Sequence, residues 1–379
     1  MTFSLSAEQE AVRAAVREFG ENEIRPVAKE YNEKKRYPEE LRHKAANFDF
    51  VASHVPEEYG GAGMEMVSSL IVTEELWRAD PGVGGAISAA DFGTGMILEY
   101  GEKWMAEKWL PKITGGETPI ATAISEPGHG SDLAGIETRA EKDSNEYVLN
   151  GQKMWITNGT VSDVALIMAK TDHDAGQQGI TAFLTPTDVP GYRAEPIDNK
   201  LGISAADTAE IVLDDLRIPA ENIVGERNRG FYQLMQFLAP ARANVGAQAV
   251  GVSQAALDQS LDYAREREQF GQSIAEFQAI QHKLAEMATA LEAARSLTYR
   301  AGDCIESGDE RSATKLASMA KLFASEHSVD ITDEAIQVHG GAGYVSDHDV
   351  ERFFRDARIT KIYDGTSEIQ KNIIADQLL

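Results

Sequence analysis

The sequence of 379 residues contains only one cysteine, Cys304, so it forms no intrachain disulfide, and a metal site built from thiolates is not expected. No run approaches the roughly 18 consecutive apolar residues that cross a membrane as a helix. The first ten residues contain neither a basic nor an apolar segment, unlike a secretory signal. These absences predict a cytoplasmic protein that does not insert into a membrane.

Basic residues are scarce relative to acidic ones: 36 Lys and Arg face 61 Asp and Glu, which gives a formal net charge of −25. Nucleic acid is repelled by such a surface, so we expect no nucleic-acid partner. The acidity itself has two interpretations that the sequence leaves open, a well-solvated surface or a docking face for a partner protein.

Several common catalytic motifs are also absent. No Gly-x-Gly-x-x-Gly follows a predicted strand, and neither a P-loop nor a Gly-x-Ser-x-Gly occurs. The eight histidines are scattered, with no pair at the i, i+4 spacing of helical metal ligands. Rossmann, hydrolase and metal-site readings are therefore disfavoured.

What is present is a three-part pattern of secondary structure. Helical periodicity fills the first third and begins with a capping box at Ser6 and Gln9. Short apolar runs bounded by Gly, Asn and Pro then predict strands, and long helical patterns follow. We expect a mainly α fold with a central β-domain: an N-terminal helical domain (residues 1–117), a middle antiparallel, barrel-like β-domain (118–229) and a C-terminal four-helix bundle (230–379).

Local signals refine this plan. The dipeptides Asn150-Gly151 and Asn158-Gly159 predict turns between strands. Pro240 marks a candidate kink in the long helical pattern 231–266. A last helix is expected from about Thr366.

Three segments carry residue types that suit a binding site. The Gly- and Pro-rich segment 123–132 predicts a turn whose N–H groups can bind an anion or a carbonyl. In segment 153–158, a tryptophan can cover an aromatic ring and a threonine can bond a ring nitrogen. In segment 362–370, Asp364 precedes a Gly-Thr pair at a helix start. Each alone also suits plain structure: a turn, a core Trp and an N-terminal cap.

Together, and in this order, the three segments resemble the acyl-CoA dehydrogenase family. The likeness extends over nearly the whole chain and includes Val55-Pro-Glu-Glu-Tyr-Gly-Gly61, Arg267-x-x-Phe-Gly271 and Gln337-x-x-Gly-Gly341. It implies an FAD enzyme that removes two hydrogens from the acyl part of a CoA thioester. It also implies electron transfer to an electron-transferring flavoprotein and a homo-oligomer, usually a tetramer.

The resemblance also implies roles for individual residues. The expected FAD contacts within one subunit are Ile124, Ser125, Trp155, Thr157, Thr366 and Glu368. The expected contacts with the FAD of a neighbouring subunit are Arg267, Phe270, Gln278, Gln337 and Gly341. The expected substrate contacts are Ser131, Arg242, Tyr363 and Gly365. No metal site is implied.

The expected catalytic base is Asp364, because it stands where the family usually has glutamate. The family's second base location is occupied by Ala241, so no glutamate is available at either place. Aspartate is shorter by one C–C bond, roughly 1.5 Å, and a misplacement of about 1 Å costs on the order of a hundredfold in rate.

Asp91 is a second candidate acid. It falls on the segment that lines the acyl pocket in the family, and a surface or capping role is the alternative. Family members that act on alicyclic thioesters use aspartates, so a cyclohexane- or cyclohexene-carboxyl-CoA substrate is one hypothesis. A nitroalkane-oxidase-like flavoenzyme and a silent acyl-CoA-binding flavoprotein are two others.

Overall fold

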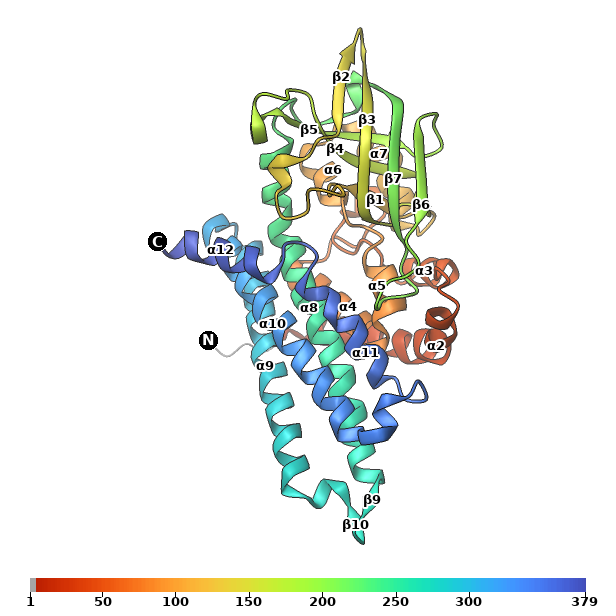
Figure 1. The fold of residues 1–379 in the computed structure, drawn as a ribbon, viewed down its shortest axis with the longest axis vertical. Coiled ribbons are helices and arrows are strands. Elements are labelled where there is room, and N and C mark those ends of the chain that lie inside the picture. The colour runs from red at the N-terminus through yellow and green to blue at the C-terminus, as the bar shows by residue number, and fades with distance from the viewer. Residues whose placement is uncertain (1–4) are drawn as a thin grey trace.

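Two helical regions flank a central β-sheet, in the order that the sequence predicts (Figure 1). The computed structural model describes residues 5–379. The sheet lies at the top of Figure 1, and three long helices run downward from it. Within residues 5–379, no helix is long and apolar enough to cross a membrane.

The N-terminal region consists of short helices. They are α1 (Ala7–Phe19), α2 (Arg25–Glu33), α3 (Glu39–Ala46), α4 (Met66–Ala79), α5 (Pro81–Ser88), α6 (Thr94–Tyr100) and α7 (Lys103–Thr114), with a π-helical turn at Gly20–Ile24 and a 3-10 turn at Glu57–Tyr59. The capping box is confirmed: the Gln9 amide donates to Ser6 Oγ at 3.1 Å, and the Ser6 amide donates to Gln9 Oε1 at 3.0 Å. Two orphan amides of α1 are thereby satisfied.

The middle region is a sheet with strand order β6-β7-β3-β2-β4-β5-β8, and β1 pairs with β4. Its strands are β1 (Ile120–Ala123), β2 (Arg139–Asp143), β3 (Glu146–Thr157), β4 (Val164–Lys170), β5 (Ile180–Pro186), β6 (Tyr192–Pro196), β7 (Thr208–Pro219) and β8 (Ile223–Val224), with 3-10 turns at Leu133–Gly135, Gly176–Gly179 and Ala220–Asn222. Most ladders are antiparallel, as expected, but β1 runs parallel to β4. The prediction of antiparallel pairing is wrong for β1 and β4. The β2–β3 hairpin lies between these two strands in the chain, so they can run in the same direction.

The turn expected at Asn150-Gly151 is wrong, since both residues lie inside β3. The register against β7 shifts between Leu149 and Gly151, which marks a bulge. Asn150 and Asp215 exchange hydrogen bonds across it, at 3.1 and 2.8 Å. A Cβ on Gly151 would stand 2.5 Å from Thr138 Oγ1, so close packing explains this glycine. The turn at Asn158-Gly159 does follow β3, as predicted.

The C-terminal region contains three long helices, α8 (Gly230–Glu266), α9 (Gln278–Glu306) and α10 (Glu310–His339). It also contains the hairpin β9 (Glu268–Gln269) and β10 (Gln272–Ser273), α11 (Val350–Ala357) and α12 (Ser367–Leu378), with 3-10 turns at Ile274–Glu276, Gly340–Tyr344 and Arg358–Lys361. The expected fourth bundle helix is the short α12, which runs across the bundle (Figure 1). Pro240 lies inside α8.

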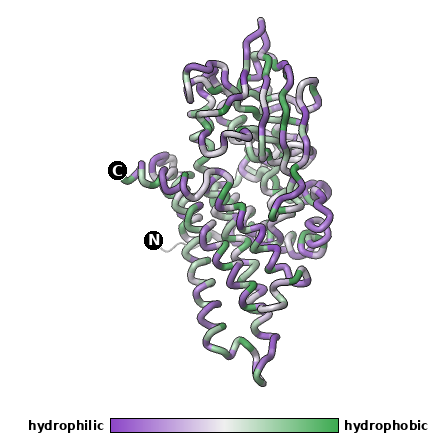
Figure 2. Tube along the Cα trace, in the orientation of Figure 1, coloured by the Kyte–Doolittle hydropathy of each residue, from purple (hydrophilic) through white to green (hydrophobic). Residues whose placement is uncertain are grey.

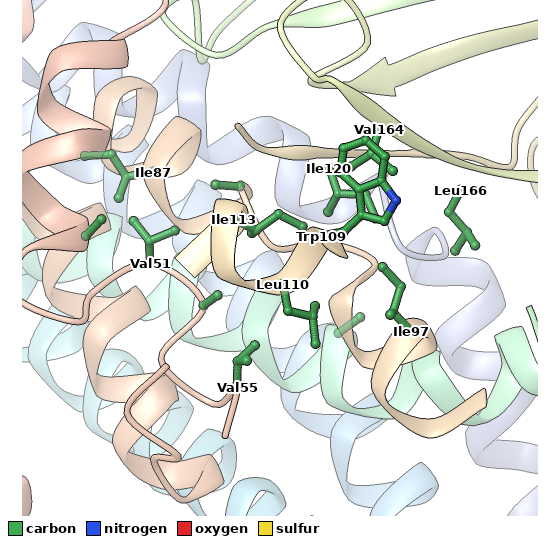
Figure 3. Packing of buried hydrophobic residues seen from close by; sticks show 14 of the residues in the cluster. Val51, Val55, Ile87, Ile97, Trp109, Leu110, Ile113, Ile120, Val164 and Leu166 are labelled. Atoms are coloured by element: carbon green, nitrogen blue, oxygen red, sulfur yellow. The ribbon is translucent and has the colours of Figure 1, made fainter. Parts of the chain in front are cut away.

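One hydrophobic cluster joins the three regions. In Figure 3, side chains of the N-terminal helices, among them Ile97 and Trp109, pack toward Ile120 of β1 and Val164 of β4. The cluster extends to Leu238 and other residues of α8. Apolar and polar residues alternate along the long helices in Figure 2, as expected for helices with one buried face.

A buried ion pair fixes the same junction. The Asp80 carboxylate caps the Val83 amide at 2.8 Å and accepts from Asn32 at 2.9 Å and from Arg352 of α11 at 2.9 Å. Breaking such a pair from one side costs roughly 3–5 kcal/mol, because a buried charge is left unpaired. The contact therefore holds α2, α5 and α11 together.

Two glycines on α8 allow a test of helix packing. A Cβ on Gly251 would stand 2.3 Å from the Glu74 carbonyl oxygen of α4, whereas a Cβ on Gly246 would meet the Thr298 hydroxyl at 2.9 Å. Both Gly→Ala changes gain about 1 kcal/mol of helix propensity. We expect Gly251→Ala to lose about 1–3 kcal/mol net, since backbone must move, and Gly246→Ala to stay near neutral. Chemical denaturation measures the free energy of unfolding of both variants. Equal values would contradict the close approach of α8 to α4 at Gly251.

Candidate active site

Asp364 sits on a strained turn between α11 and α12. Its φ is +51° and that of Gly365 is +94°, in the left-handed region that costs a non-glycine residue about 1–3 kcal/mol. Side chains from neighbouring helices hold the turn. Lys321 Nζ donates to the Gly365 carbonyl at 2.7 Å, and Gln370 Nε2 donates to the carbonyls of Asp364 and Gly365 at 3.2 and 2.8 Å.

The residues around this turn are also fixed. The Tyr363 hydroxyl donates to Gln248 Oε1 on α8. The hydroxyl of Thr366, a predicted FAD contact, accepts from the Ile369 amide at 3.4 Å and caps α12. Glu368, predicted to contact FAD, is exposed on the first turn of α12. The N-terminal cap of α12 is therefore Thr366 and not Asp364.

Asp364 is half-buried, and two buried cations act on its carboxylate. Arg242 of α8 is 4% exposed, and its Nε has no hydrogen-bond partner within residues 5–379. Lys321 of α10 is fully buried. Burial raises the pKa of Asp364 to about 6, against the opposing effect of Lys321 and Arg242. A carboxylate with such a pKa can accept a proton near neutral pH.

A second part of the site lies where β1 ends beside β3. Lys153 Nζ donates to the Ile124 carbonyl at 3.0 Å and to Glu126 Oε1 at 2.8 Å, and the Met154 amide donates to the Ser125 carbonyl at 2.9 Å. Burial lowers the pKa of Lys153 to about 8, although Glu126 opposes the shift. The backbone of Ile124 and Ser125 is therefore held rigidly against β3.

Aromatic surface is left open next to this backbone. Trp155 is 62% exposed, with φ +65°, and Thr157 is half-buried at the end of β3. The following residue, Asn158, donates to the Ala89 carbonyl at 2.9 Å and to the Ile120 carbonyl at 3.2 Å. An exposed tryptophan on a fixed strand end suits a planar ring ligand.

Asp91 lies on the loop that Asn158 anchors, two residues beyond Ala89. Its Oδ2 is 3.4 Å from His54 Nδ1, while His54 Nε2 is 3.1 Å from Thr94 Oγ1. Asp91 is thus paired with a histidine that the sequence analysis did not single out. The paired side chains are partly exposed, so a proton can reach them.

The remaining predicted cofactor residues lie at the far end of α8. Arg267 is the C-cap of α8, and Phe270, at the β9–β10 hairpin, is 94% exposed with φ +56°. Gln278, Gln337 and Gly341 are also exposed. The Tyr263 ring stacks on His339 with centroids 4.3 Å apart, which brings the 337–341 corner to this end. Arg242 and Arg267 are 25 residues apart, about 37 Å along a helix.

Ser131 is exposed on the loop that follows Ser125. A groove of about 590 Å³ opens beside this loop, and its lining includes Pro127, His129, Arg139, Lys170 and His173. Within residues 5–379, Arg139 and Lys170 form no ion pair, so their charges are available to an anion. The described part of the chain has no cluster of side chains suited to a metal ion.

The residues present fit FAD. The isoalloxazine needs polar backbone and an aromatic cover, which Ile124, Ser125 and Trp155 offer, and Thr157 adds a hydroxyl. The exposed Phe270 and Arg267 suit an adenine ring and a pyrophosphate. Because Arg267 lies about 37 Å beyond Arg242 along α8, the FAD that these two residues hold would not be the FAD beside Trp155 of the same subunit.

Sequence reasoning missed Lys321, His54 and the Lys153–Glu126 pair. Lys321 had a detectable signal, since Ala317, Ala324 and Ser325 place it on the small-residue face of α10. A lysine on the buried face of a helix requires a partner. His54 had no local signal, because its pairing with Asp91 depends on tertiary structure.

Comparisons with known proteins agree with this arrangement. The chain matches three family descriptions: "Acyl-CoA dehydrogenase, N-terminal domain" at residues 6–117, "middle domain" at 121–216 and "C-terminal domain" at 228–379. The "Probable acyl-CoA dehydrogenase fadE25" of Mycobacterium bovis is 41% identical over 377 residues, which cover 100% of this chain and 97% of that protein.

Two solved structures are similar over 100% of both chains, each with a TM-score of 0.96 and 36% identity. One is butyryl-CoA dehydrogenase from Megasphaera elsdenii. The other is a chain in a structure described as the electron-transferring flavoprotein of Acidaminococcus fermentans, from work on flavin-based electron bifurcation.

The fold and the site therefore define an FAD-dependent oxidoreductase that acts on acyl-CoA thioesters. The chain belongs to the acyl-CoA dehydrogenase family.

The Lys153–Glu126 pair gives a test of the flavin-binding backbone. Lys153→Met removes the only cation paired with the buried Glu126 carboxylate within residues 5–379 and leaves that carboxylate with the Glu137 and Thr138 amides as donors; it also removes the Lys153 donor from the Ile124 carbonyl. We expect a loss of about 3–5 kcal/mol and a lower flavin-to-protein ratio. The double variant Lys153→Met/Glu126→Gln removes both charges and should recover part of the stability. Chemical denaturation measures the free energy of unfolding, and flavin absorbance measures the flavin-to-protein ratio. A double variant that loses more free energy of unfolding than the two single variants together would contradict the pairing.

Proposed function

We propose that this chain dehydrogenates the α,β bond of an acyl-CoA thioester with Asp364 as the base. The observation that carries the proposal is the half-buried Asp364 carboxyl, whose pKa is raised to about 6 and on which the two buried cations Lys321 and Arg242 act. In the reaction the α C–H bond breaks and its proton goes to Asp364. The β C–H bond breaks with its electron pair, and a carbon–carbon double bond forms.

Bound FAD supplies the acceptor for the hydride that leaves the β-carbon. The chain's own task is to acidify and position the substrate. Within residues 5–379, the Asp364 amide N–H has no hydrogen-bond acceptor. A donor of this kind suits the thioester carbonyl oxygen, whose developing negative charge must be stabilised when the α-proton leaves. Arg242 adds positive charge nearby.

The CoA part has a matching surface. Arg139 and Lys170 line the groove beside the Ser131 loop, and the phosphates of CoA are anions. Tyr363 and Gly365 flank the base and would contact the acyl thioester, while Ser131 would contact the pantetheine arm. These roles remain proposals for substrate-binding residues.

The active species would be a homo-oligomer, most simply a tetramer. The two proposed sets of flavin contacts lie far apart in one subunit, because the sheet that carries Trp155 is at the top of Figure 1 and the β9–β10 hairpin that carries Phe270 is at the bottom. One FAD would therefore be held by Ile124, Ser125, Trp155 and Thr157 of one subunit. Its adenosine end would be held by Arg267, Phe270, Gln278, Gln337 and Gly341 of a neighbour.

The proposed electron acceptor is an electron-transferring flavoprotein, in line with the similar chain in the Acidaminococcus fermentans structure. The proposed straight-chain substrate is short, in line with the similarity to butyryl-CoA dehydrogenase. A cytoplasmic enzyme of fatty acid metabolism would fit both.

A second candidate is dehydrogenation of an alicyclic CoA thioester. The His54–Asp91 pair favours it, because a second carboxylate, paired with a histidine, lies on the loop anchored by Asn158. In that case Asp91 would take or hold a proton, alone or together with Asp364.

Anaerobic bleaching of the flavin absorbance by butyryl-CoA and by cyclohexanecarboxyl-CoA separates the two candidates. We expect fast bleaching by butyryl-CoA. Asp364→Asn should slow it by at least a hundredfold, since the base is lost, while Asp91→Asn should retain most of the rate. Full activity of Asp364→Asn would rule out the assignment, and bleaching by the ring thioester alone, abolished in Asp91→Asn, would establish the second candidate.

The pKa of Asp364 predicts the pH dependence. Only the ionised carboxylate accepts a proton, and burial raises its pKa to about 6. We expect kcat/KM for butyryl-CoA to be constant at neutral pH and to fall about tenfold for each pH unit below about 6. Stopped-flow flavin reduction between pH 5 and 8 measures this. A rate that stays constant down to pH 4.5 would mean that the base has an ordinary aspartate pKa.

A further inference from the structure

Lys321 is a buried charge that neither the sequence motifs nor the proposed reaction accounts for. Its side chain is fully buried in the helix α10, and its only hydrogen bond within residues 5–379 goes to the Gly365 carbonyl, at 2.7 Å. A lysine is almost never fully buried without a charged or polar partner that compensates for the lost water. One backbone carbonyl compensates for only part of that loss.

The charged groups that face Lys321 come from three helices. Asp364, on the turn before α12, and Glu326 and Glu368 favour its charged form, whereas Arg242 of α8 disfavours it. Burial is the largest effect and lowers the pKa of Lys321 to about 8. At neutral pH the ammonium group of Lys321 is therefore still charged. Among the groups that favour this charged form, Asp364 has the largest effect.

The same contact acts on Asp364 in two ways. Lys321 and Arg242 are the two cations that oppose the effect of burial on the carboxylate, with Lys321 the larger. Lys321 is in addition bonded to the residue next to Asp364, on a turn where both residues have positive φ. Glu326, five residues along α10, accepts from Ser367 at 2.5 Å and from Lys361, so the same helix holds both ends of the turn.

We propose that Lys321 is the positioning residue of the catalytic base: its ammonium group fixes the Asp364–Gly365 turn and keeps the Asp364 carboxylate ionised at working pH. Lys321 touches neither the substrate nor the flavin and acts through Asp364. The proposal rests on the proposed function, in which Asp364 takes the α-proton. The two cations also favour the later release of the proton, because a protonated Asp364 no longer offsets their positive charge.

The test removes the charge and keeps the length of the side chain. In Lys321→Met, the acid limb of kcat/KM should move upward by about one pH unit or more, since a nearby opposite charge shifts a carboxyl pKa by about 1–3 units. Flavin reduction at pH 6 should then fall about fivefold or more relative to its change at pH 8, because the ionised fraction of Asp364 falls mainly at the lower pH. Lys321→Arg keeps the charge and should keep the acid limb in place even if kcat falls. Lys315→Met, on the same helix, changes the net charge equally and should leave the profile unchanged.

A drop in kcat with an unmoved acid limb in Lys321→Met would overturn the proposal, because it would show a merely structural role. An equal shift in Lys315→Met would overturn it too, since the effect would then come from net charge. A shift in Lys321→Met alone supports it.

A measurement without turnover separates this proposal from the proposed function. A raised carboxyl pKa in the folded state stabilises the protein fully below the unfolded pKa, near 3.9, and this contribution is lost as pH rises to the folded pKa. The melting temperature of the wild-type holoenzyme should therefore decline between pH 4 and about 6 relative to Asp364→Asn. In Lys321→Met the decline should extend to higher pH.

If the wild-type flavin is bleached by no thioester but the melting curves shift as described, the proposed function fails and the coupling of Lys321 to Asp364 stands. If Lys321→Met does not fold, the comparison of wild type with Asp364→Asn still tests the proposal. Melting temperatures with the same pH dependence in both proteins would show that Asp364 does not titrate near pH 6. That result would overturn the proposal.

Discussion

The proposed site depends on one electrostatic arrangement, a half-buried carboxylate on which two buried cations act. Asp364 alone in such a place would remain protonated, and Lys321 and Arg242 alone would repel each other. Asp364, Glu326 and Glu368 favour the charged form of Lys321, whereas Arg242 opposes it. In the proposed reaction, the positive charge of Arg242 and Lys321 would also favour the negative charge that develops on a thioester when its α-proton leaves.

The C-terminal region supplies all three groups of this arrangement. α8 supplies Arg242, α10 supplies Lys321, and the turn before α12 supplies Asp364. The shared core that includes Ile120, Leu238 and Ala241, and the buried Asp80–Arg352 pair, hold these elements in register. A misplacement of about 1 Å costs on the order of a hundredfold in rate, so the domain junction contributes to catalysis through its rigidity.

The sequence predicted the order of helices and strands because periodicity and caps are local signals, as the capping box at Ser6 shows. It failed at Asn150-Gly151, where pairing of β3 with β7 overrides the turn propensity of the dipeptide. The candidate site was predicted from the resemblance, not from the residues alone: Asp364 by itself reads as a cap. His54 and Lys321 could not be found in that way, since their roles depend on contacts between segments 37 and 44 residues apart.

The shortened base has a consequence that follows from the turn. An aspartate is roughly 1.5 Å shorter than a glutamate, and the gap can close only if the turn advances or the substrate lies deeper. The turn is held by Lys321 and Gln370 through the carbonyls of Asp364 and Gly365, and it is already strained. Advancing it would break the hydrogen bond from the charged Lys321, at about 1.5–3 kcal/mol, and those from the neutral Gln370 amide, at about 0.5–1.5 kcal/mol each. If Asp364 is the base, the adjustment therefore falls on the substrate, whose α-carbon would come closer to the Asp364 turn.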